Sequence, residues 1–161
     1  MRLKNYERVA NKFLKENYGL ELRIPIFRNN RLRRAMGVYK TVTIDNTPCS
    51  IELSGQLLDY ATEKVIDQVL KHELIHYALH VLGRPYKDGH PIFENELVKH
   101  NSITSTKKIG EYFLLECDSC GERWETKRKR AVTHTHEYRS RCCDSSISYI
   151  KNVYYNGERK I

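Results

Sequence analysis

The chain has 161 residues, 40% of them hydrophobic, and a mean hydropathy of -0.65, so it can bury one main core and a small appended module. Its first residues are charged and no run approaches about 20 apolar residues, which excludes a signal peptide and a membrane span and predicts a soluble, cytoplasmic protein. The formal charge of +8 and the pI of about 9.3 favour anionic partners, including nucleic acid.

The first third of the chain predicts one helix followed by a sheet. Residues 3 to 17 place apolar side chains at helical spacing and predict an amphipathic helix that ends at Gly19. From residue 22 to 53 the pattern changes to short alternating runs, "LRIPIF", "GVYKTVTID" and "CSIELS", separated by the turn formers "RNNR" and "NTP". These runs predict a small, mostly antiparallel sheet.

Residues 56 to 82 predict one long helix with an apolar girdle wide enough for a buried, central position. The glycines and prolines that follow break the pattern into a loop. Pro91 suits the first turn of a further helix that carries Phe93, Leu97 and Val98. Beyond this helix the composition becomes polar and then rich in cysteine, aromatic residues and charge, so we expect a domain boundary near residue 105.

The long helix carries a metal-binding pattern, His72-Glu73-x-x-His76. Residues four apart lie on the same face of a helix, so both imidazoles can reach one ion, with Glu73 beside them. Zinc takes such nitrogen ligands at about 2.0–2.1 Å and keeps a position open for water when it is catalytic. The alternative is a helix whose histidines are satisfied core residues and bind no metal.

The third ligand must come from outside this helix. His80 repeats the four-residue step but lies ~12 Å from His72 along the helix axis, too far to share one ion. The Gly/Pro-rich loop after the helix reverses the chain and ends at His90, which is therefore the favoured third ligand. Glu94 and His100, on the next predicted helix, are less favoured candidates.

The stretch "HELIHYALHVLGRPYKDGHPIFENELVKHN" resembles the SprT-like (Spartan-type) metalloprotease family. The family pattern is HExxH, a loop, a Gly-His dipeptide and an aromatic residue, represented here by His72, Glu73, His76, Gly89, His90 and Phe93. Upstream, "RNNRLRRAMGVYKTVTIDNTPCSIELSGQLL" is similar to the family's lead-in to the active helix. The similarity covers most of residues 5 to 103, and it departs from the pattern where many relatives read Gly-His-Gly and this chain reads Gly-His-Pro.

The resemblance implies an α+β, compact zincin-like metalloprotease domain over residues 1–105. One catalytic zinc would be held by His72, His76 and His90, with Glu73 as the general base. Zinc would polarise the scissile carbonyl and lower the pKa of its bound water, and Glu73 would take the proton and pass it to the leaving amine.

The resemblance also implies a protein substrate, specifically proteins held on DNA. We expect the substrate strand to pair with the exposed edge of the sheet beside the active helix. Tyr77 and the arginines of the "RNNRLRR" turn are candidates for stabilising the oxyanion.

Residues 106–161 predict a small β zinc-ribbon-like module. In "LLECDSCGERWETKRKR", a strand leads to Cys117-x-x-Cys120, a glycine and a returning strand, which is half of a zinc ribbon. Four of the five cysteines lie in this part of the chain. The fifth, Cys49, is predicted to be a buried strand residue.

The second half of the ribbon is imperfect. Relatives often carry a second CxxC after a Tyr-Arg pair, which here places ligands at positions 140 and 143, and position 140 is serine. Cys143 fits, while Cys142 is off by one and is a candidate to replace the missing ligand of a second, structural zinc. His134 and His136 are further candidates. The alternative is a degenerate ribbon without metal.

A basic run follows the returning strand directly after Trp124. It comprises Lys127, Arg128, Lys129 and Arg130, and Arg139 and Arg141 are expected in the next strand. In the family this segment is associated with DNA contact, and basic residues beside an aromatic suit single- or double-stranded DNA. The alternative is a solvated hairpin turn.

Three functions are consistent with these patterns. The leading one is a zinc metallopeptidase with a C-terminal ribbon. The second is a zinc-containing nucleic-acid-binding or regulatory protein with little or no peptidase activity, and the third is a metal-dependent hydrolase that acts on something other than protein. The intact Glu73 favours an enzyme.

Overall fold

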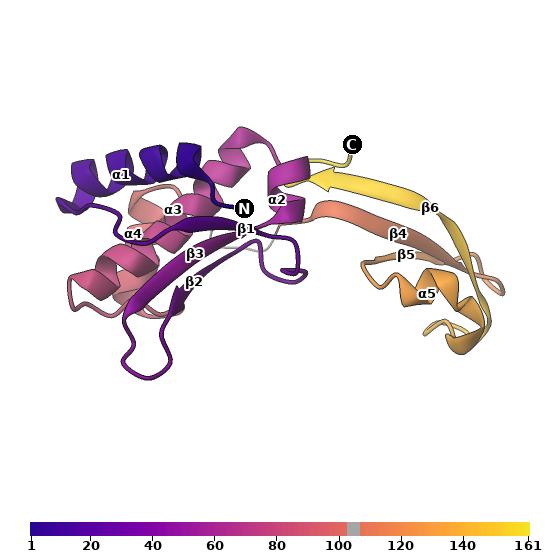
Figure 1. Ribbon diagram of the computed structural model, residues 1–161. Coiled ribbons are helices and arrows are strands. Elements are labelled where there is room, and N and C mark those ends of the chain that lie inside the picture. Colours follow the sequence, from indigo (N-terminus) through magenta and orange to yellow (C-terminus); the bar gives the residue numbers. More distant parts are fainter. Residues whose placement is uncertain (103–106) are drawn as a thin grey trace. The chain divides into compact units, whose positions relative to one another are not determined.

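The computed structural model describes residues 1–102 and 107–161 (Figure 1). The chain forms two compact units, unit 1 (Met1–Lys107) and unit 2 (Lys108–Ile161). The boundary expected near residue 105 falls outside the described residues. The fold is α+β, with a three-stranded sheet in each unit. None of the helices in the described part of the chain is long and apolar enough to span a membrane.

The sheet of unit 1 contains β1 (Ile26–Asn29), β2 (Gly37–Thr41) and β3 (Pro48–Ser54), in the order β1-β3-β2. β2 is antiparallel to β3, but β1 is parallel to it, so the sheet is mixed and not mostly antiparallel as expected. Parallel neighbours need a long crossover, and the chain between β1 and β3, which includes β2, supplies it.

The two edges of this sheet differ. The outer side of β1 is covered by the N-terminal residues, because the Leu3 amide donates to the Ile26 carbonyl at 2.8 Å and Arg2 forms a bridge with Phe27. The outer side of β2 has no strand paired with it among the described residues. β2 is therefore the open edge of the sheet.

The first helix matches the sequence prediction. α1 (Lys4–Tyr18) ends at Gly19, whose φ of 66° lets its amide donate to the Lys15 carbonyl at 3.2 Å. Ala10, Phe13 and Leu14 are its buried residues.

The single helix predicted over residues 56 to 82 is wrong, because the structure has two helices, α2 (Gly55–Tyr60) and α3 (Glu63–Val81). Each begins at its own capping hydroxyl. Ser54 accepts a hydrogen bond from the Leu57 amide, and Thr62 accepts one from the Val65 amide. Since a capping residue has extended backbone, the helix cannot run through Thr62.

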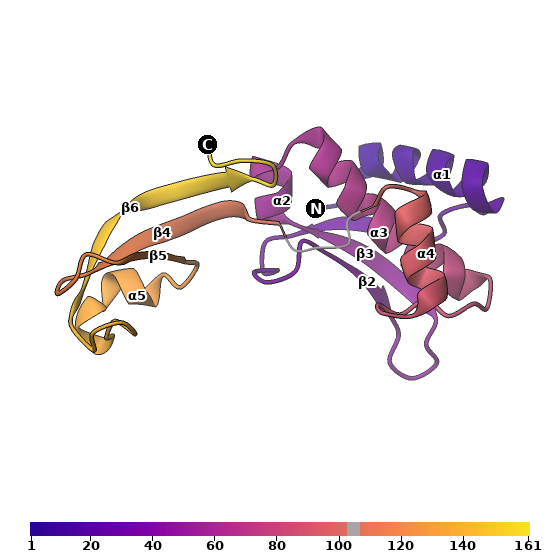
Figure 2. The ribbon, with the colours of Figure 1, turned by 180° about the vertical axis from the view of Figure 1, so that it is seen from behind.

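The central position predicted for the long helix is confirmed for α3. This helix contacts strands β2 and β3 and also the helices α1 and α4 (Pro91–Lys99) (Figure 2). Pro91 occupies the first turn of α4, as predicted, and Phe93 and Leu97 are buried. Val98, which also lies in this helix, is 74% exposed.

Unit 2 is an antiparallel sheet of β4 (Ile109–Cys117), β5 (Arg123–Thr126) and β6 (Ile147–Asn156), in the order β5-β4-β6. Between β5 and β6 the chain also forms a short helix, α5 (Arg130–Thr133), and a 3-10 turn, η1 (Thr135–Glu137), neither of which was expected. Leu115, Ala131 and Ile147 form a small core, with Trp124, Val132 and Tyr138 packed against it.

Three local predictions are corrected. The run Lys127–Arg130 leads into α5 and does not turn a hairpin. Arg139 and Arg141 lie in the loop before β6, not in a strand. Cys49 is exposed on β3, not buried, because it lies where the register between β2 and β3 shifts.

Candidate metal centres

α3 brings the largely buried side chains of His72 and His76 together in unit 1. Their Nε2 atoms are 3.1 Å apart. The Oδ1 atom of Asp88, from the loop after α3, lies 3.2 Å from Nε2 of His72 and 3.6 Å from Nε2 of His76. These three residues offer ligand atoms that all lie within 4.8 Å of one another, so they can hold a metal ion.

The orientation of His76 is fixed by a backbone carbonyl. Its Nδ1 hydrogen-bonds to the carbonyl oxygen of Tyr86, and since a carbonyl only accepts, Nδ1 carries the proton. Burial lowers the pKa of His76 and so favours the neutral ring. The ring also stacks on Phe93, with centroids 4.1 Å apart. The lone pair on Nε2 is therefore directed at His72 and Asp88, as in a histidine prepared to bind metal.

Glu73 lies against the backbone of β2. A Cβ atom at Gly37 would lie 2.8 Å from the carboxylate Oε1 of Glu73, so only glycine leaves room for this approach. The Tyr39 amide donates a hydrogen bond to the carboxylate, which lowers its pKa, but burial outweighs this and raises the pKa to about 8, with a smaller contribution from Asp88. The side chain is a buried base or acid beside the two histidines.

His80 lies outside this group. Its Nδ1 hydrogen-bonds to the Tyr39 hydroxyl at 2.7 Å, its Nε2 lies 3.3 Å from the Asn46 amide nitrogen, and its ring stacks on Tyr86 at 4.3 Å. These contacts tie the loop after α3 to the turn between β2 and β3.

The other predicted ligands have different partners. His90 is the N-cap of α4, and its Nδ1 accepts a hydrogen bond from the Ile92 amide at 3.3 Å. Glu94 accepts from the Gly89 amide, and His100 packs against α1 and pairs with Glu96. Among the described residues, none of these three side chains belongs to the group formed by His72, His76 and Asp88.

Two of the candidates for stabilising the oxyanion, Tyr77 and Arg28, have structural partners. The Tyr77 hydroxyl is buried, donates to the Glu21 carbonyl and accepts from the Arg23 amide. In the "RNNRLRR" turn, Arg28 forms a paired contact with both carboxylate oxygens of Asp59.

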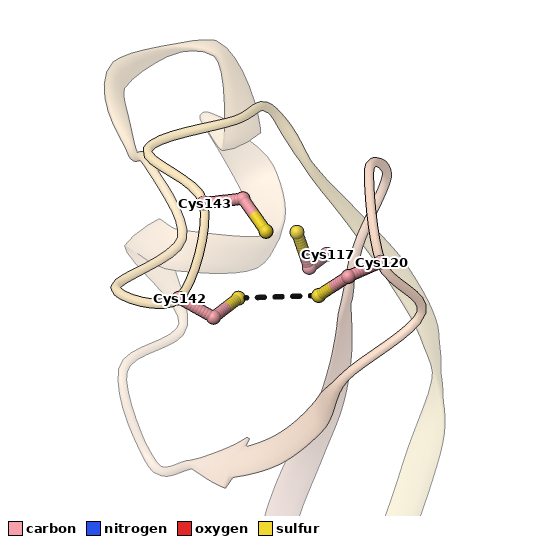
Figure 3. Close-up of side chains that lie close together, drawn as sticks. All are labelled: Cys117, Cys120, Cys142 and Cys143. Carbon is pink, nitrogen blue, oxygen red and sulfur yellow. Dashed lines mark hydrogen bonds between the residues drawn. The ribbon is translucent and has the colours of Figure 1, made fainter.

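Unit 2 has a second candidate centre, made of four cysteines (Figure 3). Cys117 is the last residue of β4 and Cys120 lies in the turn to β5, while Cys142 and Cys143 lie in the loop before β6. The four side chains point toward one another, and their sulfur atoms all lie within 4.8 Å of one another. The group does not include His134 or His136. Four converging thiols are the donor set of a structural zinc site.

Ser140, which occupies the position of the missing cysteine, lies beside this group. Its buried hydroxyl is 3.2 Å from the sulfur of Cys117 and accepts a hydrogen bond from the Ser145 amide. The neutral thiol of Cys117 donates to this oxygen, and the hydroxyl can donate in turn to the ionised sulfur. This hydrogen bond, followed by one from the Cys120 backbone, lowers the pKa of Cys117 to about 6. Burial raises the pKa of Cys142 to about 11.

Comparison with known proteins identifies the family of this chain. The model of the SprT-like family matches residues 3–107, about the whole of unit 1. The chain belongs to the SprT-like family.

Curated relatives carry the same name. A protein SprT-like from Streptococcus thermophilus is 25% identical over 141 residues, which cover 84% of this chain and 90% of the relative. A protein SprT-like from Bacillus subtilis is 31% identical over 129 residues, 76% of this chain and 80% of the relative. One from Bacillus cereus is 30% identical over 107 residues, 63% and 67% of the two chains.

The predicted nucleic-acid-binding residues lie on unit 2. Lys127 to Arg130 are exposed, and Arg130 is paired with Glu137 through two hydrogen bonds of 2.8 and 3.0 Å. Trp124 is half-buried and lines a cavity of about 460 Å³ together with Arg128, Arg139 and Arg141. The lining also includes apolar residues and two glutamates, Glu122 and Glu125.

Sequence reasoning missed three contributors to the two centres. Asp88 lies two residues before His90 in the same loop, and its acidic side chain was the only sign in the sequence that it could bind a metal. The Tyr86 carbonyl is a backbone group, so a pattern of side chains cannot predict its contact with His76. Ser140 was noted as a gap in the cysteine pattern, but its hydrogen bond to Cys117 depends on the fold of the loop.

Proposed function

We propose that this SprT-like chain is a zinc-dependent metallopeptidase whose unit 1 is a zincin-like domain. The observation that carries the proposal is the convergence of His72 and His76 beside a buried carboxylate, Glu73. Two imidazole Nε2 atoms 3.1 Å apart, one with its tautomer fixed by a carbonyl, suit the nitrogen-rich coordination of zinc. Membership of the SprT-like family also supports a zinc-dependent metallopeptidase.

The residues of the chain have distinct roles in this proposal. His72 and His76 hold the metal, with a third ligand from the loop that contains Asp88 and His90. When bound, zinc would polarise the scissile carbonyl and increase the acidity of the attacking water. Glu73 accepts the water's proton on its carboxylate and delivers it to the leaving nitrogen.

The environment of Glu73 suits a base that must first take and then release a proton. It is 6% exposed, and its burial favours the protonated form in the metal-free chain, whereas a dication bound beside it would favour the carboxylate that acts as the base. The Tyr39 amide, which donates to the carboxylate, keeps it oriented in both protonation states. Gly37 allows the close approach that this hydrogen bond requires.

The substrate would bind as an extended strand along β2. This strand is the open edge of the sheet, and it carries the backbone that contacts Glu73. Pairing with an edge strand recognises the peptide backbone more than its side chains. Such binding fits an enzyme with broad sequence tolerance.

Unit 2 would hold a structural zinc on Cys117, Cys120, Cys142 and Cys143 and bring the enzyme to DNA. The exposed basic run suits contact with phosphates, and Trp124, in a cavity that three arginines help to line, suits a stacked base. Proteins held on DNA would then be the substrates.

The test is peptide-bond hydrolysis by zinc-loaded protein, with and without single-stranded or duplex DNA, against the Glu73→Gln variant. Self-cleavage and cleavage of a DNA-bound protein are both scored. Removing a general base typically costs about 10²- to 10⁴-fold in rate, so the variant should retain zinc and lose nearly all activity. Glu63→Gln, a matched change in the first turn of the same helix, should leave the rate unchanged.

Equal hydrolysis by wild type and Glu73→Gln would refute the assigned base. DNA binding without hydrolysis under any condition would instead favour the zinc-containing nucleic-acid-binding protein. Replacing Lys127–Arg130 with serine should weaken DNA binding and flatten its dependence on salt, because fewer counterions are released. No binding at low salt would remove DNA from the proposal.

A further inference from the structure

We propose that unit 2 carries a second contact for nucleic acid, where three lysines gather on one face of its sheet and bind the phosphate backbone. The inference rests on the proposed function, in which unit 2 brings the enzyme to DNA. The residues that form this lysine cluster are Lys108, Lys127, Lys160, Tyr112, Tyr155 and Glu125.

The register of the sheet places the cluster on one face. Tyr112 and Leu114 share a face of β4, and Glu125 of β5 pairs with Leu114. Tyr155 of β6 pairs with Gly110, two residues before Tyr112. Neighbouring residues of a strand point to opposite faces, so these side chains point away from the small core that contains the single tryptophan and α5. In the described part of the chain, none of the three lysines lines the cavity beside that tryptophan.

The aromatic rings hold the lysines in place. Lys108 Nζ lies 5.0 Å from the ring centroid of Tyr155 and 5.7 Å from that of Tyr112. Lys127 Nζ lies 4.8 Å from the Tyr112 centroid, and Lys160 Nζ lies 5.9 Å from the Tyr155 centroid. Ammonium groups within about 6 Å of a ring centroid are attracted to the ring face. The two rings therefore gather three cations, and because the lysines lie over the ring faces, the cluster suits phosphates better than stacked bases.

One carboxylate lies among these cations. Glu125 is 14% exposed and pairs with Lys108 at 2.7 Å and with Lys160 at 3.4 Å. The Tyr155 hydroxyl donates to both carboxylate oxygens, at 2.8 and 2.9 Å, and so fixes their position. A single carboxylate is thus shared between two lysines. With three lysines and one glutamate, the cluster has a formal charge of +2.

This excess of positive charge favours an anionic partner. Like charges gathered on one surface repel each other, and a bound polyanion relieves that repulsion. All three lysines are exposed residues, so their ammonium groups can reach phosphates without a change in the sheet. Lys127 is also the first residue of the basic run Lys127–Arg130, which follows the edge strand β5. The run and the cluster form one continuous basic surface, which suits an extended phosphate backbone better than a compact anion.

The test measures how the full, zinc-loaded chain binds a fluorescein-labelled single-stranded oligonucleotide of mixed sequence, by fluorescence anisotropy at several salt concentrations. The test variant replaces the three lysines of the cluster with glutamine. The control makes the same change in net charge on unit 1, at three exposed lysines of α1, Lys4, Lys12 and Lys15. Each lysine of the cluster is also replaced alone, so that one misfolded variant does not decide the result. Circular dichroism and zinc content check that every variant is folded.

We expect the triple variant of the cluster to bind about 25- to 100-fold more weakly than wild type at roughly 0.1 M salt. Each phosphate contact to a single strand contributes about 0.7 to the slope of log affinity against log salt, so this slope should become shallower by about 1.4 to 2. The smaller change corresponds to a cluster in which Glu125 offsets one lysine. Each single variant should show a part of the loss. The α1 control should stay within about twofold of wild type, because lysines outside the contact release no counterions.

Glu125→Gln separates a binding role from a structural one. Loss of the carboxylate raises the charge of the cluster and should tighten oligonucleotide binding about fivefold at roughly 0.1 M salt. It also removes the partner of two lysines, so the free energy of unfolding should fall. Urea unfolding followed by the fluorescence of the single tryptophan, which lies in unit 2, measures this loss. Lower stability without any gain in affinity would show that the cluster only stabilises the sheet, and would overturn the inference.

An unchanged affinity and salt slope in the triple variant, while wild type binds, would overturn the cluster and leave the rest of the proposed function intact. Equal losses in the triple variant and the α1 control would also overturn it, because net charge alone would then explain the binding. Competition by polyglutamate as strong, per charge, as by unlabelled oligonucleotide would exclude nucleic acid as the specific partner. If wild type binds no oligonucleotide at low salt, DNA is removed from the proposed function and the cluster falls with it, whereas peptide hydrolysis by unit 1 is still measured separately.

Discussion

Replacing Glu73 by Gln should make the metal-free protein more stable at high pH and leave it nearly unchanged at low pH. Burial raises the pKa of Glu73 from 4.5 to about 8, so between these values the folded chain holds a proton that the unfolded chain has lost. Stability therefore falls as pH rises through this window. At about 1.4 kcal/mol per pH unit, the full difference is worth about 5 kcal/mol, reached above pH 8. Glutamine has no charge to bury, so the variant escapes this loss.

The assay is urea unfolding of chelator-treated wild type and Glu73→Gln at several pH values from 5 to 9. Circular dichroism at the helix band is the right probe, because the long helices lie in unit 1 and the single tryptophan lies in unit 2. The two free energies of unfolding should diverge as pH rises. Glu63→Gln, an exposed change on the same helix, should run parallel to wild type. A constant difference between wild type and Glu73→Gln across this range would refute the reasoning.

Two further predictions concern the packing of each centre. Gly37→Ala places a Cβ 2.8 Å from the Glu73 carboxylate and should lower the free energy of unfolding by about 1–3 kcal/mol. The loss should be much smaller in a Glu73→Ala background, because the carboxylate is then absent. Equal losses in both backgrounds, measured by urea unfolding, would contradict this steric explanation. Ser140→Ala removes the main cause that lowers the pKa of Cys117, so this thiol should ionise at a higher pH than in wild type. On acidification, unit 2 should therefore release zinc at a higher pH than in wild type. Thiolate absorbance and zinc release against pH measure this, with Ser119→Ala as the control; identical release curves for wild type and Ser140→Ala would show that the hydroxyl has no part in the site.

The features that the sequence predicted well depend on local spacing. The first helix and its end at Gly19 follow from apolar periodicity and from a glycine with positive φ, and both are present. The pairing of His72 with His76 is a property of one helix face, so four residues of spacing are enough to predict it. The CxxC turn between β4 and β5 is equally local.

The features that it predicted poorly depend on which partner a residue finds in the folded chain. The break at Thr62 lies inside an apolar pattern that runs on through α2 and α3, so periodicity gave no sign of it. The parallel pairing of β1 with β3 is decided by the path of the chain between them. Cys142, Cys143 and Ser140 share a short loop, and its turn, not the spacing, decides which side chains face Cys117.

His80, the third histidine of α3, has a structural role because its ring stacks on Tyr86. The Tyr86 carbonyl accepts a hydrogen bond from His76, and the Tyr86 ring stacks on His80, so a histidine outside the candidate metal centre supports one within it. The three histidines of α3 therefore differ in position, because two lie in the candidate metal centre and one packs under the loop that holds it. Random mutagenesis should accordingly find His80 intolerant of small side chains but tolerant of aromatic ones, whereas His72 and His76 should accept neither.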